Sequence, residues 1–193
     1  MKNIIFFDFD LDLSAKKRWE YIFDYYAYYL PKLSTELKRI LDSFGLVTSL
    51  VKPIYTLTRS SNIMFYDEIC YVAKRIGIEP SKALLMQLIY ETSSACTATV
   101  LKIGTKDFFF RTMDWSMMFL KDITIGLNIK KDGRYIGKVT TWLGYVGFLT
   151  TTNIINNYTI TINYCSTTEI SITSLAKKSL PHHWNEMANR IFG

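Results

Sequence analysis

Residues 94–100, Ser-Ala-Cys-Thr-Ala-Thr-Val, mark the point at which a helical pattern gives way to a strand-like one. Before Cys96 the apolar residues recur at helical spacing, and after it they alternate with a period of two. Arg111 and Asp114 follow shortly after, on or just beyond the next predicted strand. The sequence therefore places a nucleophilic residue at the start of a strand, with a cation and a carboxylate close by.

The part of the chain before Cys96 is predicted to be mainly helical, after a short strand over residues 4–11. Pro31 is expected to stop the first helix, and residues 46–62 are expected to form a loop. Cys70, on the third helix, is expected to be a small buried side chain. The four predicted helices cover about residues 15–29, 35–44, 65–76 and 80–90.

The part after Cys96 is predicted to form consecutive antiparallel strands joined by short turns. Residues 104–107 are expected to form a four-residue turn, so that Ile103 faces Phe108, and Asp132-Gly133 is typical of a tight hairpin turn. The six predicted strands cover about residues 97–103, 108–113, 123–129, 135–142, 145–150 and 158–163, and a further strand (170–175) and a helix (181–192) are expected in the tail.

These segments predict one structural domain of the α+β class. A helical segment, residues 1–95, is followed by an antiparallel β-sheet segment, residues 96–193. About half of the residues, 49%, are apolar, which is enough for a substantial core.

The charge of +6 is spread over short, separate groups of lysine and arginine. A nucleic-acid groove usually has a denser basic stripe, so no nucleic-acid partner is expected. Two interpretations of these basic residues stay open: contact with an anionic membrane surface, or simple exposure to solvent. The N-terminal apolar run ends at Asp8, too early for an export signal, so a cytoplasmic location is the default expectation. No metal site or cofactor is expected, because the chain has only three widely spaced cysteines and two adjacent histidines, Cys70, Cys96, Cys165, His182 and His183.

The residue types around Cys96 suit nucleophilic chemistry. A guanidinium such as that of Arg111 favours the thiolate form of a nearby thiol, and the carboxylate of Asp114 could orient an amine. If the bond between Ala95 and Cys96 were cut, the new α-amine, with a pKa of about 7.7–8.0, would serve as a base beside the thiol. The residues alone leave two plainer readings open, a packed cysteine and a surface Arg–Asp pair, and a register slip of one residue would change which of the two charges shares a face with Cys96.

Several motifs along residues 8–165 resemble those of one family and follow in the same order as in that family. Residues 90–100, Tyr-Glu-Thr-Ser-Ser-Ala-Cys-Thr-Ala-Thr-Val, are similar to the maturation site of the acid ceramidase and N-acylethanolamine acid amidase family, which are N-terminal-nucleophile hydrolases related to choloylglycine hydrolases. Residues 110–114, Phe-Arg-Thr-Met-Asp, resemble its Gly-Arg-Asn-Met-Asp motif. Further similar segments are residues 11–13, 17–19, 143–150 and 159–163.

The resemblance implies a partial αββα fold and a self-processing amidase. Cys96 would cleave its own preceding peptide bond, and its thiol would then attack the amide of an N-acylated lipid such as ceramide or an N-acylethanolamine. Arg111 and Asp114 would position the nucleophile and its amine, and Asn163 would contribute to the oxyanion hole.

Trp142 and Tyr145 are candidates to line an acyl pocket. Hydrophobic packing within the sheet is the alternative role for both side chains. The chain departs from the family at Tyr164, where the family has a glutamate, and it is shorter. We therefore expect half of the sandwich to be absent and a sheet face to be exposed as an apolar patch, which a homodimer or a second chain would cover.

Two alternatives to an active amidase stay open. The first is a shortened, catalytically inactive member of the family that serves as a binding or interaction module. The second is a papain-like hydrolase in which His182 or His183 acts with Cys96, which requires the tail to fold back onto the hairpin.

Overall fold

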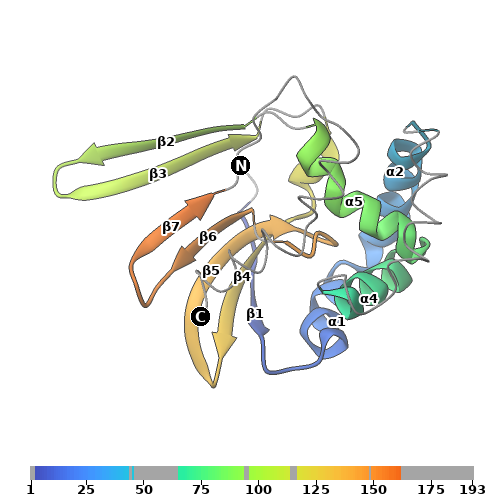
Figure 1. Ribbon diagram of the computed structural model, residues 1–193, viewed down its shortest axis with the longest axis horizontal. Coiled ribbons are helices and arrows are strands. Elements are labelled where there is room, and N and C mark those ends of the chain that lie inside the picture. The colour runs from blue at the N-terminus through green and yellow to red at the C-terminus, as the bar shows by residue number, and fades with distance from the viewer. Residues whose placement is uncertain are drawn as a thin grey trace, which may run out of the picture.

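A computed structural model of the chain describes residues 3–43, 45, 65–93, 96–113, 117–147 and 149–161. The fold is α+β: helices lie beside a five-stranded sheet, and a separate hairpin projects away from both (Figure 1). The loop expected over residues 46–62 and the tail elements expected after residue 165 lie outside the described residues.

The five-stranded sheet is mixed, with the strand order β1-β4-β5-β6-β7. Its strands are β1 (Phe6–Asp10), β4 (Thr124–Lys131), β5 (Arg134–Trp142), β6 (Thr150–Asn153) and β7 (Tyr158–Thr161). The strand β1 pairs parallel to β4, so the expectation of a purely antiparallel sheet is wrong. The reason is that β1 precedes the helices in sequence, and a parallel pairing needs such a long crossover between its two strands.

The strand expected over residues 145–150 is also wrong, because β6 begins only at Thr150. Residues 143–146 form a turn region in which Gly144 has φ +88, a conformation that a regular strand does not contain. By contrast, the tight turn at Asp132-Gly133 is present, and both residues have positive φ, as this hairpin turn requires.

The hairpin consists of β2 (Cys96–Ile103) and β3 (Lys106–Met113) and forms a sheet of its own. The predicted single meander of six strands is therefore divided in two. Ile103 faces Lys106 instead of Phe108, because the chain reverses within two residues at Gly104, where φ is +63. The register is thus shifted by two residues from the one expected, and β3 begins two residues earlier than the sequence suggested.

The helices are α1 (Ala15–Tyr25), the 3-10 turn η1 (Ala27–Tyr29), α2 (Leu30–Ser43), α4 (Tyr66–Ile76) and α5 (Pro80–Ser93). Pro31 does not stop a helix but lies in the first turn of α2, where its missing N–H has no helical partner to lose. Gly77 ends α4 with φ +78 and donates its N–H to the Ala73 carbonyl. None of the helices in the described part of the chain is long and apolar enough to cross a membrane.

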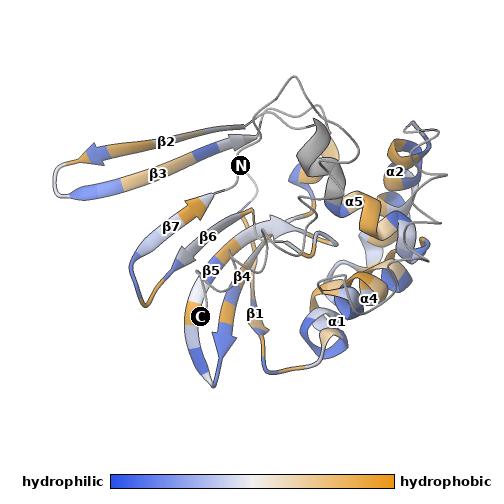
Figure 2. Cartoon of the chain, in the orientation of Figure 1, coloured by the Kyte–Doolittle hydropathy of each residue, from blue (hydrophilic) through white to orange (hydrophobic). Residues whose placement is uncertain are grey.

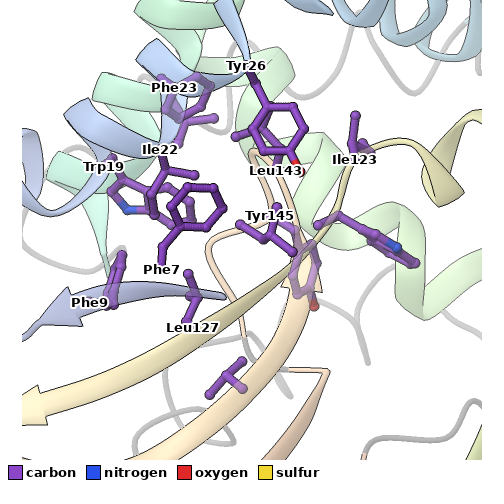
Figure 3. Close-up of a cluster of buried hydrophobic side chains, with 14 of the residues drawn as sticks. Phe7, Phe9, Trp19, Ile22, Phe23, Tyr26, Ile123, Leu127, Leu143 and Tyr145 are labelled. Carbon is purple, nitrogen blue, oxygen red and sulfur yellow. The ribbon is translucent and has the colours of Figure 1, made fainter. Parts of the chain in front are cut away.

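The core lies between the helices and one face of the five-stranded sheet (Figure 3). Ile125, Leu127 and Ile129 of β4 point into it and are at most 1% exposed. Trp19 and Phe23 of α1 pack against this face, and Trp19 meets the ring of Phe9 in an edge-to-face contact at 5.2 Å. Burial of these side chains is what joins the helical segment to the sheet.

The opposite face of the five-stranded sheet carries mainly polar side chains, beside the exposed rings of Phe6 and Tyr135. Several threonines lie on it, and the hydroxyls of Thr150 and Thr161 (3.2 Å) and of Thr152 and Thr159 (3.0 Å) are hydrogen-bonded across neighbouring strands. The expectation of an exposed apolar face is therefore wrong for this sheet. The hairpin does expose apolar side chains: Val100 is 64% and Ile103 is 60% exposed. Figure 2 shows apolar segments along both of its strands. Threonines on this face are Thr124, Thr140, Thr150, Thr152, Thr159 and Thr161.

Candidate active site

The base of the hairpin brings Cys96 and Arg111 to neighbouring positions. Cys96 lies opposite Met113, and Ala98 lies opposite Arg111. Because successive residues of a strand alternate between faces, positions 96, 98 and 111 belong to the same face of the hairpin. Positions 96 and 111 are diagonal neighbours, which are about 7–8 Å apart in regular antiparallel pairs.

Arg111 itself is half-buried. Asp114, one residue beyond the end of β3, lies outside the described residues, and so does Asn163. The register therefore sets two of the four predicted site residues at neighbouring positions, and their chemical roles and the arrangement of the other two stay predictions. Tyr164, Cys165, His182 and His183 lie outside the described residues as well.

The expected cleavage point falls where the helical segment meets the hairpin. Helix α5 ends at Ser93 and β2 begins at Cys96, so only two residues join them. Three peptide units span at most about 10–11 Å, so the position of the end of α5 limits where Cys96 can lie.

Trp142 and Tyr145 lie in the core, where they are 8% and 5% exposed. Their rings meet edge-to-face, with centroids 5.9 Å apart and planes at 76°. Tyr145 also borders a small cavity of about 20 Å³, enough for one water molecule, whereas Trp142 does not line it. Core packing is thus a role that both side chains have in the fold, and their predicted contact with an acyl chain stays a prediction.

A buried ion pair lines the same small cavity. The guanidinium of Arg18 lies 2.6 Å from the Glu68 carboxylate, and the Arg18 Nε also donates to the Leu13 carbonyl at 2.8 Å. The side chain of Glu68 is only 6% exposed, and that of Arg18 is 17% exposed. This pair joins α1 to α4 beneath the turn that carries Tyr145. The sequence gives no local sign of it, because its partners lie fifty residues apart.

A larger open cavity, of about 490 Å³, lies between α2 and the 3-10 turn η2 (Met118–Lys121). Its volume falls within the range of small-molecule sites, about 300–1,000 Å³. It begins at Met117, four residues after the end of β3, and an ion pair of 2.9 Å between Arg39 and Glu36 borders it. The run Met117-Met118-Phe119 is the one local sign of this cavity in the sequence, since methionine adapts to irregular apolar ligands. The lining residues are Glu36, Arg39, Ile40, Ser43, Met117, Met118 and Phe119.

Within the described ranges, no group of three or more histidine, cysteine or carboxylate side chains lies close enough together to hold a metal ion. Cys70, on α4, is partly exposed and is not in a disulfide. It is therefore less buried than the sequence suggested.

Comparison with known proteins shows a distant similarity to acid ceramidases. The chain is 24% identical to the acid ceramidase of Rattus norvegicus over 160 residues, and 22% identical to a probable acid ceramidase of Caenorhabditis elegans over 177 residues. These alignments cover 73% and 77% of the chain and 41% and 42% of the two relatives. The similarity thus supports the ceramidase resemblance at the level of distant relationship.

A stronger match is to an uncharacterized protein, R632, of Acanthamoeba polyphaga mimivirus. It is 40% identical over 177 residues, which cover 92% of this chain and 55% of that protein. The chain therefore spans about half the length of the curated relatives it matches. No protein-family model matches the chain.

Proposed function

We propose that the protein is an amidase of the acid ceramidase type, which hydrolyses the linear amide bond of N-acylated lipids through Cys96. The observation that carries this proposal is the hairpin register, with Arg111 on the same face as position 96, in a chain that is similar to acid ceramidases. The chemistry needs a thiolate, and a nearby guanidinium stabilises one.

The first step would free the nucleophile. The Cys96 thiol attacks the carbonyl carbon of residue 95, the peptide C–N bond breaks, and the acyl group passes to sulfur as a thioester. Water then hydrolyses that thioester, which leaves a new carboxylate on residue 95, the free thiol and the free α-amine of Cys96. The chain would become two subunits, residues 1–95 and residues 96–193.

The pairing of strands between the two subunits would keep them associated after cleavage. The strand β1 comes from the first subunit and pairs with β4 of the second over five residue pairs. Phe7 and Phe9 of β1 are each only 4% exposed in the shared core. Separation would expose this core, so the cleaved protein would stay assembled.

The second step would hydrolyse the substrate. The thiolate of Cys96 attacks the amide carbonyl of the lipid, and the α-amine carries the proton to the departing amine. The resulting thioester reacts with water, which releases the fatty acid and restores the thiol. In this proposal Arg111 stabilises the thiolate, Asp114 orients the α-amine, and Asn163 donates to the oxyanion of each tetrahedral intermediate.

The acyl chain is proposed to occupy the cavity between α2 and η2. The cavity has a suitable volume, it contains Met117 and Phe119, and it starts four residues beyond β3. Trp142 and Tyr145 are the alternative acyl contacts, but such a role would require a change in their core packing. A substrate of this kind is held in membranes, so we also propose contact with a membrane surface.

The second candidate function is an inactive binding module. The exposed apolar side chains of the hairpin favour it, because contiguous apolar surface marks interaction sites. In this version a homodimer or a second chain would cover the hairpin. An active enzyme would also tolerate such a partner, so surface exposure alone does not separate the two candidates.

Intact-protein mass spectrometry separates them. We expect the purified wild-type chain to divide into fragments of residues 1–95 and 96–193, and Cys96→Ala to stay whole. Ser94→Ala is the matched control and should still divide, because it changes a neighbouring residue but not the nucleophile. Hydrolysis of a fluorescent N-acyl amide should follow cleavage. Equal hydrolysis by wild type and Cys96→Ala would reject the amidase proposal.

A further inference from the structure

Gln87 makes an unusual set of contacts for a helical side chain. It lies on α5, six residues before the helix ends at Ser93, and it is only 7% exposed. Its Nε2 donates to the carbonyl of Ala83 on its own helix and to the carbonyl of Gly144, both at 3.1 Å. Its Oε1 accepts the N–H of Val146 at 2.8 Å. One buried amide therefore joins α5 to the turn between β5 and β6.

The orientation of this amide is determined by its partners. Two carbonyl oxygens face Nε2 and one N–H faces Oε1, so the reversed orientation would set like groups against each other. A buried amide with all three partners is stabilising, whereas loss of the side chain would leave the Gly144 carbonyl and the Val146 N–H buried without it. The loss of stability on replacing Gln87 should therefore arise mainly at this one turn.

The turn is held from a second helix as well. Gly144 has φ +88, and a Cβ there would lie 2.8 Å from Cδ1 of Ile76 on α4. The backbone N–H groups of Leu143 and Tyr145 donate to the carbonyls of Ile123 and Trp142 at 2.8 Å and 3.0 Å. The turn is therefore held by its own backbone hydrogen bonds and by contact with α4, and Gln87 connects it with α5.

We propose that Gln87 is a positioning residue, which fixes the end of α5 against this turn and thereby sets the location of Cys96. The inference rests on the proposed function, because it concerns the bond that Cys96 would cleave. Only two residues separate Ser93 from Cys96, so we expect a shift of the helix end to move the nucleophile. After cleavage the same hydrogen bonds would connect the two subunits.

The test uses the full chain with Gln87→Met, which has a similar length and no amide. Leu33→Ala is the control: Leu33 is fully buried on α2, distant in sequence from the turn and the cleavage point, and its loss lowers stability by cavity formation. We expect Gln87→Met to slow cleavage before Cys96 by about 10–100-fold, the effect of displacing a reacting group by about 1 Å. Leu33→Ala should divide at nearly the wild-type rate wherever it is folded. Equal slowing by the two variants would overturn the proposal.

Gln87→Glu adds a pH readout that simple packing does not give. Burial beside two carbonyl oxygens would raise the pKa of this glutamate above its ordinary value of about 4.3. The neutral carboxyl can donate to one carbonyl and accept from Val146, whereas the carboxylate cannot donate. Cleavage by Gln87→Glu should therefore recover as the pH is lowered, relative to wild type at each pH. A constant ratio between the two chains would count against the proposal.

Hydrogen exchange of the backbone amides separates failure of this inference from failure of the proposed function. If wild type does not divide at all, the amidase proposal fails, but the position of α5 can still be measured. Faster exchange in Gln87→Met at both residues 88–96 and residues 142–147 supports the inference. Faster exchange at residues 142–147 alone shows that Gln87 holds only the turn, and overturns it.

Discussion

The five-stranded sheet and the β2–β3 hairpin have similar alternating sequences but opposite surroundings. In the sheet, Leu127 is 1% exposed beneath the helices, and the outward face is polar. In the hairpin, Val100, Ile103 and Phe110 are 51–64% exposed, and the rings of Phe108 and Phe110 stack with centroids 6.5 Å apart. Alternation therefore predicts a strand correctly but does not show which strands lie in a core.

The buried sheet and the exposed hairpin are expected to have different tasks, stability for the sheet and the proposed chemistry for the hairpin. An isolated two-stranded hairpin is marginal in water, so β2 and β3 depend on their base and on whatever covers their faces. The candidate residues Cys96 and Arg111 lie at that base, next to one another in the register. Figure 1 shows the base of the hairpin directed toward the helices. We therefore expect substitutions in the sheet and its helices to change stability, and substitutions at the hairpin base to change activity.

The largest effect is expected at the buried ion pair. Arg18→Met leaves the carboxylate of Glu68 buried without its partner, which should lower the free energy of unfolding by about 3–5 kcal/mol. Arg111→Met, at a half-buried side chain of the hairpin, should cost less stability than Arg18→Met, and should abolish cleavage before Cys96. Urea unfolding gives the first quantity and mass spectrometry the second.

The double variant Arg18→Met, Glu68→Leu is the control for this measurement. It removes both charges, so it should recover most of the lost stability, as apolar replacements of buried ion pairs often do. If the double variant is as unstable as Arg18→Met, packing of the arginine stem would be the cause instead of the unpaired charge. If Arg111→Met is the less stable of the two single variants, the contrast between the regions is wrong.

The next effect compares two apolar side chains. Leu127→Ala opens a cavity in the core and should cost about 2–5 kcal/mol. Ile103→Ala, near the tip of the hairpin, should change stability by less than about 0.5 kcal/mol, because its side chain is already largely in water. Thermal unfolding at one protein concentration measures both. A large loss for Ile103→Ala would show that a partner, including a second copy, covers the hairpin.

The elements that the sequence predicted well are those with local signals. Helix α4 has an apolar stripe and ends at Gly77, and α5 begins at Pro80, both as expected. The β4–β5 turn follows from Asp132-Gly133. In each case the residues that determine the element lie within it, so no knowledge of distant parts was needed.

The features that the sequence could not show depend on distant partners. The pairing of Phe7 with Leu127 joins positions 120 residues apart, and nothing in either strand specifies a parallel neighbour. The contact of Gln87 with the turn at Gly144 is of the same kind. For the site, sequence reasoning indicated that Cys96 and Arg111 are close, but their common face depends on the length of the turn at Gly104.

Two glycines, one in the packed region of the sheet and one at the tip of the hairpin, give a smaller and more local test of the difference between the two regions. Both Gly144 and Gly104 have positive φ, so alanine at either position should cost roughly 1–2 kcal/mol of backbone strain. At Gly144 the new Cβ also meets Ile76, which adds about 1 kcal/mol, whereas nothing lies within 4 Å at Gly104. The difference between the two unfolding free energies isolates the crowding at the turn. Equal losses would mean that the turn relaxes away from α4.

The smallest effect concerns Asp8, which connects β1 to its neighbours on the outward face of the sheet. Hydrogen bonds from Lys130 (2.7 Å) and Tyr135 (2.9 Å) lower the pKa of the Asp8 carboxyl, and the same contact raises the pKa of Lys130. The folded protein thus holds this proton less tightly than the unfolded chain does. The resulting stabilisation is present above the ordinary aspartate pKa of about 3.9 and is lost as the pH falls through the lowered pKa of the folded state.

Asp8→Asn should therefore be less stable than wild type at neutral pH, and the two free energies of unfolding should converge in acid. The difference at neutral pH should be smaller than the loss in Gly104→Ala, because the carboxylate is half exposed to solvent. Tyr135→Phe removes one of the two strongest contacts and should give an intermediate dependence on pH. Urea unfolding between pH 2 and pH 7 measures all three chains. A constant difference across that range would show that Asp8 acts through its shape and not through its charge, so that the polar face contributes to the sheet without electrostatic pairing.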